Sequence, residues 1–269
     1  MIDVLEKIVA LTRERLSREA PAERSAAETS AKSRKAFGLS AALRPGGEAG
    51  PQKAIRVIAE IKSASPSAGT IVVDPDVTAI AADYAYGGAA AISVVTEEDF
   101  FKGSRDWIER AAFASGLPIL MKDFVIEESQ LVRGVAAGAS GILLLASLLD
   151  GVQIAEFIAC LDGLQCDALV EVHDEWELER AVAGGARLIG VNNRNLRDFA
   201  VDLATSERLA KLISDQTIRV AESGIRTRQD VDRLHAAGFD AFLVGESLLR
   251  QNDRAAAVRQ LVETGGERP

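Results

Sequence analysis

The sequence predicts an α/β fold, a (β/α)8 TIM barrel with an N-terminal helical extension. In one recurring signature a helix ends at glycine and a strand follows: "YGGAAAISVV" at 86, "ASGLPILMKD" at 114, "AAGASGILLL" at 136, "AGGARLIGVN" at 183 and "AAGFDAFLVG" at 236. With "IRVIAEIK", "DALVEV" and "TIRVAES" these runs make eight strands, centred near residues 58, 92, 119, 143, 170, 189, 219 and 242. Amphipathic stretches such as "ESQLVRGVAAG" and "EWELERAVAGG" lie between them. Evenly spaced, near-continuously apolar strands separated by helices favour a closed barrel over an open doubly wound sheet.

The chain before the first strand, residues 1–54, forms the extension. "MIDVLEKIVALTRERL" places apolar residues at helical spacing, which predicts a helix to about Arg18; an Ala-, Ser- and Glu-rich stretch and the Gly/Pro-rich "RPGGEAGPQ" follow. Either these residues are a solvated extension with a mobile linker, or they cover one mouth of the barrel. Residues 55–250 form the barrel core and 251–269 a C-terminal helix and tail. We therefore expect residues 1–269 to be a single TIM-barrel domain.

Composition limits the kinds of partner. Hydrophobic residues make up 48% of the chain, enough for a large core, and the formal net charge is −9. That charge argues against a surface that binds nucleic acid or an anionic membrane, but it allows a local basic pocket for a small anionic metabolite. The N-terminus resembles neither a secretory signal nor a transit peptide, and no apolar run approaches the ~20 residues of a membrane span. We expect a soluble cytoplasmic protein, a monomer or weak homo-oligomer, with a small-molecule anionic substrate.

No pattern in the chain indicates a metal or a cofactor. His173 and His235 lie on separate elements, and no H-x-x-H or carboxylate cluster has ligand spacing. No G-x-G-x-x-G follows the first strand, so a dinucleotide is not implied. Cys160 and Cys166 form no C-x-x-C pair, and we interpret both as small buried apolar residues.

Polar side chains stand at the ends of several predicted strands, which is where barrel enzymes place their active sites. Successive side chains on a strand alternate between faces, so each of these residues extends a column that faces the barrel interior. A single buried lysine or glutamate is commonly a paired structural ion. Several at the same end of one barrel are hard to explain by stability alone, because burying unpaired charge is costly. The predicted active site contains Glu60, Lys62, Lys122, Glu171, Asn192, Arg194 and Glu222.

The loops after the last two strands predict a phosphate site. "ESGIRT" and "VGESLL" each carry glycine before the expected start of a helix, and barrels commonly bind phosphate there through backbone N–H groups. Gly224 and Gly245 are the positions where the backbone would approach phosphate oxygens, with Ser65 and Ser223 as possible hydroxyl donors. Each glycine taken alone is better explained as a turn residue, and only its position after the seventh or eighth strand makes phosphate binding an equal or better explanation.

Several of these motifs together resemble one family. In order, "IAEIKSASPSAG", "ISVVTEEDFFKGS", "PILMKDFVI", "LVEVHDEWEL", "IGVNNRNL", "VAESGI" and "FLVGESLL" are similar to the strand motifs of the indole-3-glycerol phosphate synthase family, over residues 55 to 250. "LEKIVALTRERL" is similar to that family's extra N-terminal helix. The resemblance implies a carboxy-lyase of tryptophan biosynthesis. It would close the ring of 1-(2-carboxyphenylamino)-1-deoxyribulose 5-phosphate, losing carbon dioxide and water, to give indole-3-glycerol phosphate.

The resemblance also implies catalytic roles. Lys122 would be the general acid that protonates the substrate ketone as the ring attacks it. Lys62 would pair with the substrate carboxylate, and either Lys62 or Glu171 would act in the dehydration. Glu60 would orient the lysines and the leaving hydroxyl. Independently, protonating a ketone near neutral pH favours a lysine whose pKa is lowered by burial and a second cation, with adjacent glutamates keeping it charged.

The remaining implied roles concern substrate binding. Phe101 and Phe124 would contact the anthranilate ring, and Gly224, Gly245 and Glu246 would lie at the phosphate. Arg194 and Asn192 would bind the carboxylate and the ribulose hydroxyls, and Glu222 and Ser223 would bind the polyol. The family often has serine at the position of Glu246, so only backbone binding to phosphate is expected there, and residues 19–54 are longer and richer in Ala and Ser than the family pattern.

Two alternatives were weighed. A barrel similar to phosphoribosylanthranilate isomerase would use a cysteine and an aspartate, and neither Cys160 nor Cys166 falls at the C-terminal end of a strand. A catalytically silent sugar-phosphate binding protein would be suggested by loss of Lys122 or Glu171, and both are present.

Overall fold

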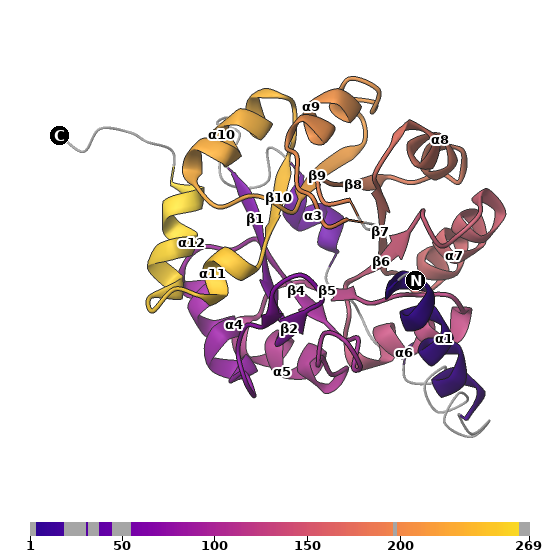
Figure 1. Ribbon diagram of the computed structural model, residues 1–269, viewed down its shortest axis with the longest axis horizontal. Coiled ribbons are helices and arrows are strands. Elements are labelled where there is room, and N and C mark those ends of the chain that lie inside the picture. The colour runs from indigo at the N-terminus through magenta and orange to yellow at the C-terminus, as the bar shows by residue number, and fades with distance from the viewer. Residues whose placement is uncertain (1–3, 19–30, 32–37, 45–54, 196–197, 264–269) are drawn as a thin grey trace.

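The protein is a closed eight-stranded barrel surrounded by helices, as the computed structural model shows (Figure 1). The structure describes residues 4–18, 31, 38–44, 55–195 and 198–263. The strands pair in the order β1-β10-β9-β8-β7-β6-β5-β4, and every neighbouring pair is parallel. The predicted (β/α)8 barrel is confirmed. Its strands are β1 Arg56–Ile61, β4 Ala91–Val95, β5 Ile119–Lys122, β6 Gly141–Leu145, β7 Asp167–Val172, β8 Leu188–Asn192, β9 Ile218–Glu222 and β10 Ala241–Val244.

Several helices begin where the sequence offers a side chain that caps free backbone N–H groups. Asp150 accepts from the Gln153 N–H, and Thr227 from the Asp230 N–H, each within a capping box. Gly138 ends its helix with a left-handed φ of 108°. The helices after β1 are α4 Val77–Tyr86, α5 Asp106–Ser115, α6 Glu128–Ala137, α7 Gly151–Gly163, α8 Glu175–Ala183, α9 Ala204–Ala210, α10 Arg228–Ala236, α11 Glu246–Leu249 and α12 Arg254–Val262. The predicted C-terminal helix is thus present, and residues 264–269 of the tail lie outside the described residues.

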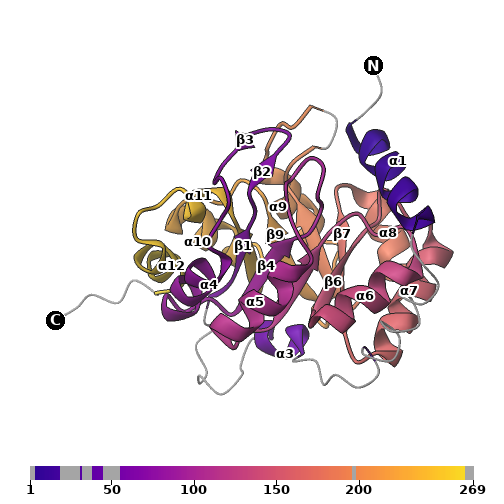
Figure 2. The same ribbon diagram turned by 90° about the horizontal axis from the view of Figure 1, so that it is seen from below.

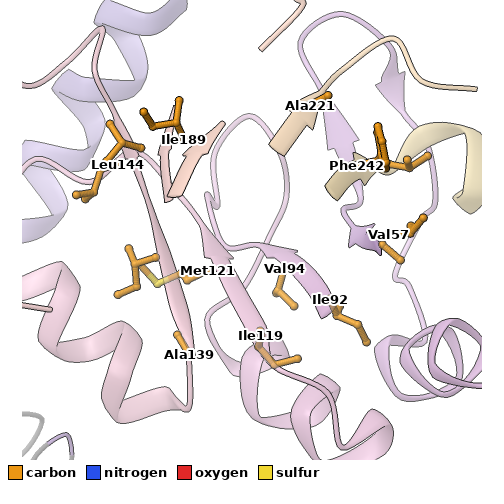
Figure 3. Packing of buried hydrophobic residues seen from close by; sticks show 14 of the residues in the cluster. Val57, Ile92, Val94, Ile119, Met121, Ala139, Leu144, Ile189, Ala221 and Phe242 are labelled. Carbon is orange, nitrogen blue, oxygen red and sulfur yellow. The ribbon is translucent and has the colours of Figure 1, made fainter. Parts of the chain in front are cut away.

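Two apolar clusters hold this arrangement together. An outer cluster packs between strands and helices, and Figure 3 shows part of it, including Val57, Met121, Ile189 and Phe242 from four strands. A second, interior cluster fills the barrel. One of its layers is contributed by alternate strands β1, β5, β7 and β9, as barrel geometry requires. That layer consists of Ile58, Leu120, Leu169 and Val220.

The extension reaches both ends of the barrel. The helix α1 Val4–Ser17 agrees with the predicted helix to about Arg18, and it lies at the end where the strands finish. The helix α3 Leu39–Leu43, which was not predicted, lies at the opposite end (Figure 2). Leu39 and Leu43 are fully buried in the interior cluster, and Gly141 leaves the space that Leu39 occupies. The hypothesis that the extension covers a mouth is therefore correct, while the expected linker falls largely in residues 45–54, outside the described part.

A two-stranded hairpin, β2 Ala64–Ser65 with β3 Gly69–Thr70, follows β1 and was also not predicted. Of the two cysteines, Cys166 is buried as expected, but Cys160 is only half-buried. No helix in the described part of the chain is long and apolar enough to cross a bilayer.

Candidate active site

Four charged side chains form a layer at the barrel mouth, directly above the apolar layer of β1, β5, β7 and β9. Each lies two residues after its apolar counterpart, because side chains two apart on a strand share a face. The layer consists of Glu60, Lys122, Glu171 and Glu222. The three carboxylates are almost fully buried, at 2%, 1% and 1% exposed for Glu60, Glu171 and Glu222. The predicted inward orientation is therefore confirmed.

Lys122 is the centre of this layer. Its Nζ donates to Glu171 Oε2 at 2.9 Å and to Glu222 Oε2 at 3.2 Å, so one cation serves two buried carboxylates. The Lys62 Nζ donates to Glu60 Oε1 at 2.5 Å and forms a second ion pair beside the first. The sequence "IAEIK" thus carries a carboxylate and an ammonium because both face the mouth rather than the packed interior.

The second oxygen of Glu171 has its own donors. Asn192 Nδ2 donates to Glu171 Oε1 at 2.9 Å, while Asn192 Oδ1 accepts from the Arg194 backbone N–H at 3.0 Å. His173 Nε2 lies 3.4 Å from the same Oε1. Glu171 therefore has positive or hydrogen-bonding neighbours on both oxygens, whereas Glu222 Oε1 is buried with no hydrogen-bond partner among the described residues.

The pKa of Lys122 is shifted in the direction opposite to the predicted one. Burial by itself would lower the pKa of Lys122, but the charges of Glu171, Glu222 and Glu60 outweigh it and raise that pKa above its ordinary value. The expectation of a lowered lysine pKa is therefore wrong, because three carboxylates surround Lys122. Lys122 holds its proton firmly at neutral pH.

The two carboxylates next to Lys122 are shifted in opposite directions. Burial alone would raise the pKa of Glu171, but the positive charges of Lys122 and His173 and the Asn192 hydrogen bond lower it to about 2. For Glu222, burial and then the charge of Glu171 outweigh Lys122 and raise the pKa to about 8. Like charges in one site are separated in this way, one carboxyl group ionising and its neighbour holding a proton.

Two glycines make room for the buried carboxylates. A Cβ at Gly190 would overlap Glu222 Oε1, and a Cβ at Gly245 would lie 2.6 Å from Glu60 Oε1. Gly245 has φ −124°, so its need for glycine is space rather than backbone conformation. The requirement for space at Gly245 is independent of any role of this residue in binding phosphate.

The predicted phosphate loops lie together at one side of the mouth. Ser223 and Gly224 both have left-handed φ values, 64° and 82°, which turn the chain sharply after β9. Gly245 is the N-cap of the short helix α11, where the predicted helix start is confirmed. After Gly224 the next helix, α10, begins only at Arg228. The Glu246 carboxylate accepts from Arg250 Nε at 2.9 Å, so its charge is paired.

The aromatic side of the mouth is held by a buried carboxylate that the sequence analysis missed. The Phe101 and Phe124 rings lie 5.9 Å apart at 42°. Glu97, which is fully buried, accepts from the backbone N–H groups of Phe100 at 2.7 Å and Phe101 at 2.9 Å. Arg15 of α1 lies 3.9 Å from Glu97, so the N-terminal helix contacts the loop that carries Phe101.

All the predicted site residues lie around one cavity of about 500 Å³. They are the charged layer of Glu60, Lys122, Glu171 and Glu222, together with Lys62, Ser65, Phe101, Phe124, Asn192, Arg194, Ser223, Gly224, Gly245 and Glu246. The apolar side chains of Val4, Leu5 and Ile8 on α1 close the cavity from above. The functional role of each residue stays a prediction.

His173 is another residue near the site to which the sequence analysis gave no role; Asp123, Arg226 and Ser247, which line the cavity, also received none. His173 follows Glu171 by two positions, so the same parity rule that grouped the strand-end residues would have found it. Among the described residues, no group of three or more His, Cys, Asp and Glu side chains could hold a metal ion.

Comparisons with known proteins agree with this site. The family model described as indole-3-glycerol phosphate synthase matches residues 5–261. A Lactiplantibacillus plantarum protein named indole-3-glycerol phosphate synthase is 46% identical over 210 residues, covering 78% of this chain and 81% of its own length. Indole-3-glycerol phosphate synthase 2 of Ralstonia nicotianae is 47% identical over 209 residues, with 78% of each chain covered.

Similarity to solved structures concerns the fold alone. Thiamine phosphate pyrophosphorylase from Pyrococcus furiosus superimposes with a TM-score of 0.57 at 16% identity, covering 78% of this chain and 94% of that one. The match over residues 5–261, together with relatives above 45% identity, is decisive at the level of family. The chain belongs to the indole-3-glycerol phosphate synthase family.

Proposed function

We propose that the protein is an indole-3-glycerol phosphate synthase of tryptophan biosynthesis. It closes the ring of 1-(2-carboxyphenylamino)-1-deoxyribulose 5-phosphate: the aromatic carbon bearing the carboxylate bonds to the ketone carbon, the carboxylate leaves as carbon dioxide, and the ketone oxygen leaves as water. The observation that carries this proposal is that residues scattered along the chain from Glu60 to Glu246 line one cavity in a member of this family.

Lys122 is the general acid of the proposed ring closure. The buried carboxyl groups around it, above all the ionised Glu171, keep its pKa raised, so it enters the reaction with a proton to give. The ketone oxygen becomes far more basic as the ring carbon attacks, and at that moment it can take the proton. Glu171, ionised beside Lys122, stabilises the cationic cyclised intermediate and lies close enough to act in the dehydration.

Glu222 and Glu60 have supporting roles in the same proposal. Glu222 carries a proton near neutral pH and can donate a hydrogen bond to a substrate hydroxyl, together with Ser223. Glu60 orients Lys62 through their ion pair. Lys62 and Glu171 both line the cavity and are the two candidate groups for the dehydration.

The two ends of the substrate occupy different walls. Phe101 and Phe124 contact the anthranilate ring, and Lys62 and Arg194 bind its carboxylate as charge-assisted partners. The phosphate lies at the loops of Gly224 and Gly245, where backbone N–H groups bind it. Glu246 contributes through its backbone, since its carboxylate is paired with Arg250.

We further propose that residues 1–269 form a single domain, since α1 and α3 pack against opposite ends of the barrel. Location in the cytoplasm suits a substrate whose carboxylate and phosphate prevent it from crossing a membrane unaided, and a monomer or weak homo-oligomer stays a prediction.

The direct test is to incubate the purified protein with 1-(2-carboxyphenylamino)-1-deoxyribulose 5-phosphate and follow the rise of indole fluorescence. The expected result is steady turnover that Lys122→Met removes. Binding of this compound without any rise in fluorescence would instead identify a silent sugar-phosphate binding protein.

A further inference from the structure

His173 connects a helix outside the barrel to the carboxylate layer inside it. It lies one residue beyond β7, and its side chain is only 14% exposed. The Nδ1 atom lies 2.9 Å from Glu177 Oε2, which also accepts the His173 backbone N–H at 2.8 Å. The opposite ring nitrogen, Nε2, lies 3.4 Å from Glu171 Oε1. The imidazole therefore bridges a carboxylate of α8 and a carboxylate of the active-site layer.

His173 lies behind the wall of the cavity: Glu171, Lys122 and Glu222 line it, whereas His173 does not. Because His173 Nε2 lies 3.4 Å from Glu171 Oε1, we expect His173 to act on the reaction through Glu171.

Lys122 by itself does not determine which of Glu171 and Glu222 is the ionised carboxyl group. Lys122 contacts one oxygen of Glu171 and one of Glu222 at similar distances, 2.9 and 3.2 Å. The outer oxygens differ: Glu171 Oε1 faces Asn192 and His173, while Glu222 Oε1 is buried without a hydrogen-bond partner among the described residues. Asn192 is a neutral donor, so His173 is the charge-bearing group on that side.

His173 is suited to carry that charge. The groups that face it are Glu177 from α8, Glu171 from β7 and Glu222 from β9, with the Lys122 ammonium beyond Glu171. Burial by itself would lower the pKa of His173, but the Glu177 hydrogen bond and the three carboxylates outweigh it and raise that pKa. With Nδ1–H donated to Glu177, the buried Nε2 makes no hydrogen bond among the described residues, and it lies within ion-pair distance of Glu171 Oε1, at 3.4 Å.

We propose that His173, held by Glu177, is a positioning residue that assigns the negative charge of the site to Glu171 and leaves the proton on Glu222. This deepens the proposed function, on which its catalytic consequence rests. With His173 charged, Glu171 is the carboxylate that stabilises a cationic intermediate, and Glu222 is the acid that donates a hydrogen bond. Without that charge, the pKa of Glu171 rises toward that of Glu222, so the gap that keeps the proton on Glu222 narrows.

The first test needs no substrate, so it stands even if the proposed reaction fails. The chain has two histidines, and His235→Asn leaves His173 as the one imidazole to observe by nitrogen NMR during a pH titration. The expected pKa of His173 is above the ordinary value of about 6.5. Adding Glu177→Gln should lower it by about one unit or more, because an opposite charge in contact is lost. A His173 that is neutral at pH 7, or insensitive to Glu177→Gln, overturns the proposal.

The second test measures turnover. His173→Asn and Glu177→Gln should both lower kcat on the acid side of neutral pH, where Glu171 begins to take up a proton, while KM stays within about twofold of wild type. In both variants the acid-side fall of kcat should begin about one pH unit higher than in the wild type. His235→Asn is the matched control and should keep the wild-type profile.

The two variants also separate a positioning role from a structural one. Glu177→Gln keeps the imidazole and the shape of α8, so it stays informative if His173→Asn destabilises the fold. If either variant folds normally and keeps the wild-type kcat profile, His173 does not act through Glu171.

Discussion

Lys122→Met tests the centre of the site, since it removes the ammonium and keeps the length of the side chain. The lost cation lies 2.9 Å from Glu171 and 3.2 Å from Glu222, both almost fully buried. If Lys122 is the general acid, kcat should fall by about 10²–10⁴-fold, with little change in KM.

The same substitution has a calculable effect on stability. Removing one partner of a buried ion pair costs about 3–5 kcal/mol when the remaining charge stays ionised. Glu171 can reduce that cost by taking up a proton, so its pKa in the folded variant should rise above the unfolded value of about 4.3, and the already raised pKa of Glu222 should rise further. A carboxyl group with a raised folded pKa loses stability as pH rises from its unfolded pKa through its folded pKa. The deficit of the variant relative to wild type should therefore grow between about pH 5.5 and 8.5, by at least the ~1.4 kcal/mol of one pKa unit.

The assay combines turnover with urea unfolding at those two pH values. Lys211→Met, at an exposed lysine that directly follows α9, is the matched control. It should leave kcat unchanged and alter the free energy of unfolding by no more than about 0.5 kcal/mol. The reasoning is refuted if kcat of Lys122→Met stays within about threefold of wild type, which is less than a general acid contributes. A stability deficit that is equal at both pH values would show that the two glutamates do not share the charge of Lys122.

Three further predictions concern the mouth and its cover. Gly245→Ala should lower kcat as well as raise KM, because its Cβ would meet the Glu60 carboxylate; a change in KM alone would leave phosphate binding as the role of this glycine. Glu60→Gln should slow the reaction with little change in substrate affinity, whereas Lys62→Ala should reduce both the rate and the affinity. In a double-mutant cycle on kcat/KM the two effects should not add, and strict additivity would make Glu60 and Lys62 a structural ion pair. Arg15→Met should raise KM, because it frees the Phe101 loop from α1, and it should cost about 1 kcal/mol or less of stability. Arg18→Met, at the exposed residue that directly follows the helix, should leave KM unchanged.

Much of the fold and site follows from local patterns. Apolar runs and glycine-ended helices predicted the eight strands, since both depend on residues near one another in the chain. Strand parity predicted that Glu60, Lys122, Glu171 and Glu222 face the same mouth, because the period of two holds wherever a strand forms. Parity would also have identified His173, had it been applied one step beyond the end of β7.

Other features depend on contacts between distant segments. The sequence "LSAAL" has no pattern that assigns it to the bottom of a barrel; α3 lies there because Gly141 leaves space for Leu39. Glu97 was not recognised as buried: the N–H groups that it binds belong to Phe100 and Phe101 of its own loop, and only its ion pair with Arg15 of α1 joins it to a distant segment.

The sequence by itself determined the barrel, the end at which its chemistry lies and the residue types gathered there. Tertiary structure alone decided how those charges act on one another. The sign of the pKa shift at Lys122 depends on three carboxylates from β1, β7 and β9 converging on one ammonium, and closure of the barrel brings together residues more than 100 positions apart. Coulomb energy varies with distance and with burial, and neither quantity is encoded in the spacing of residues along a chain.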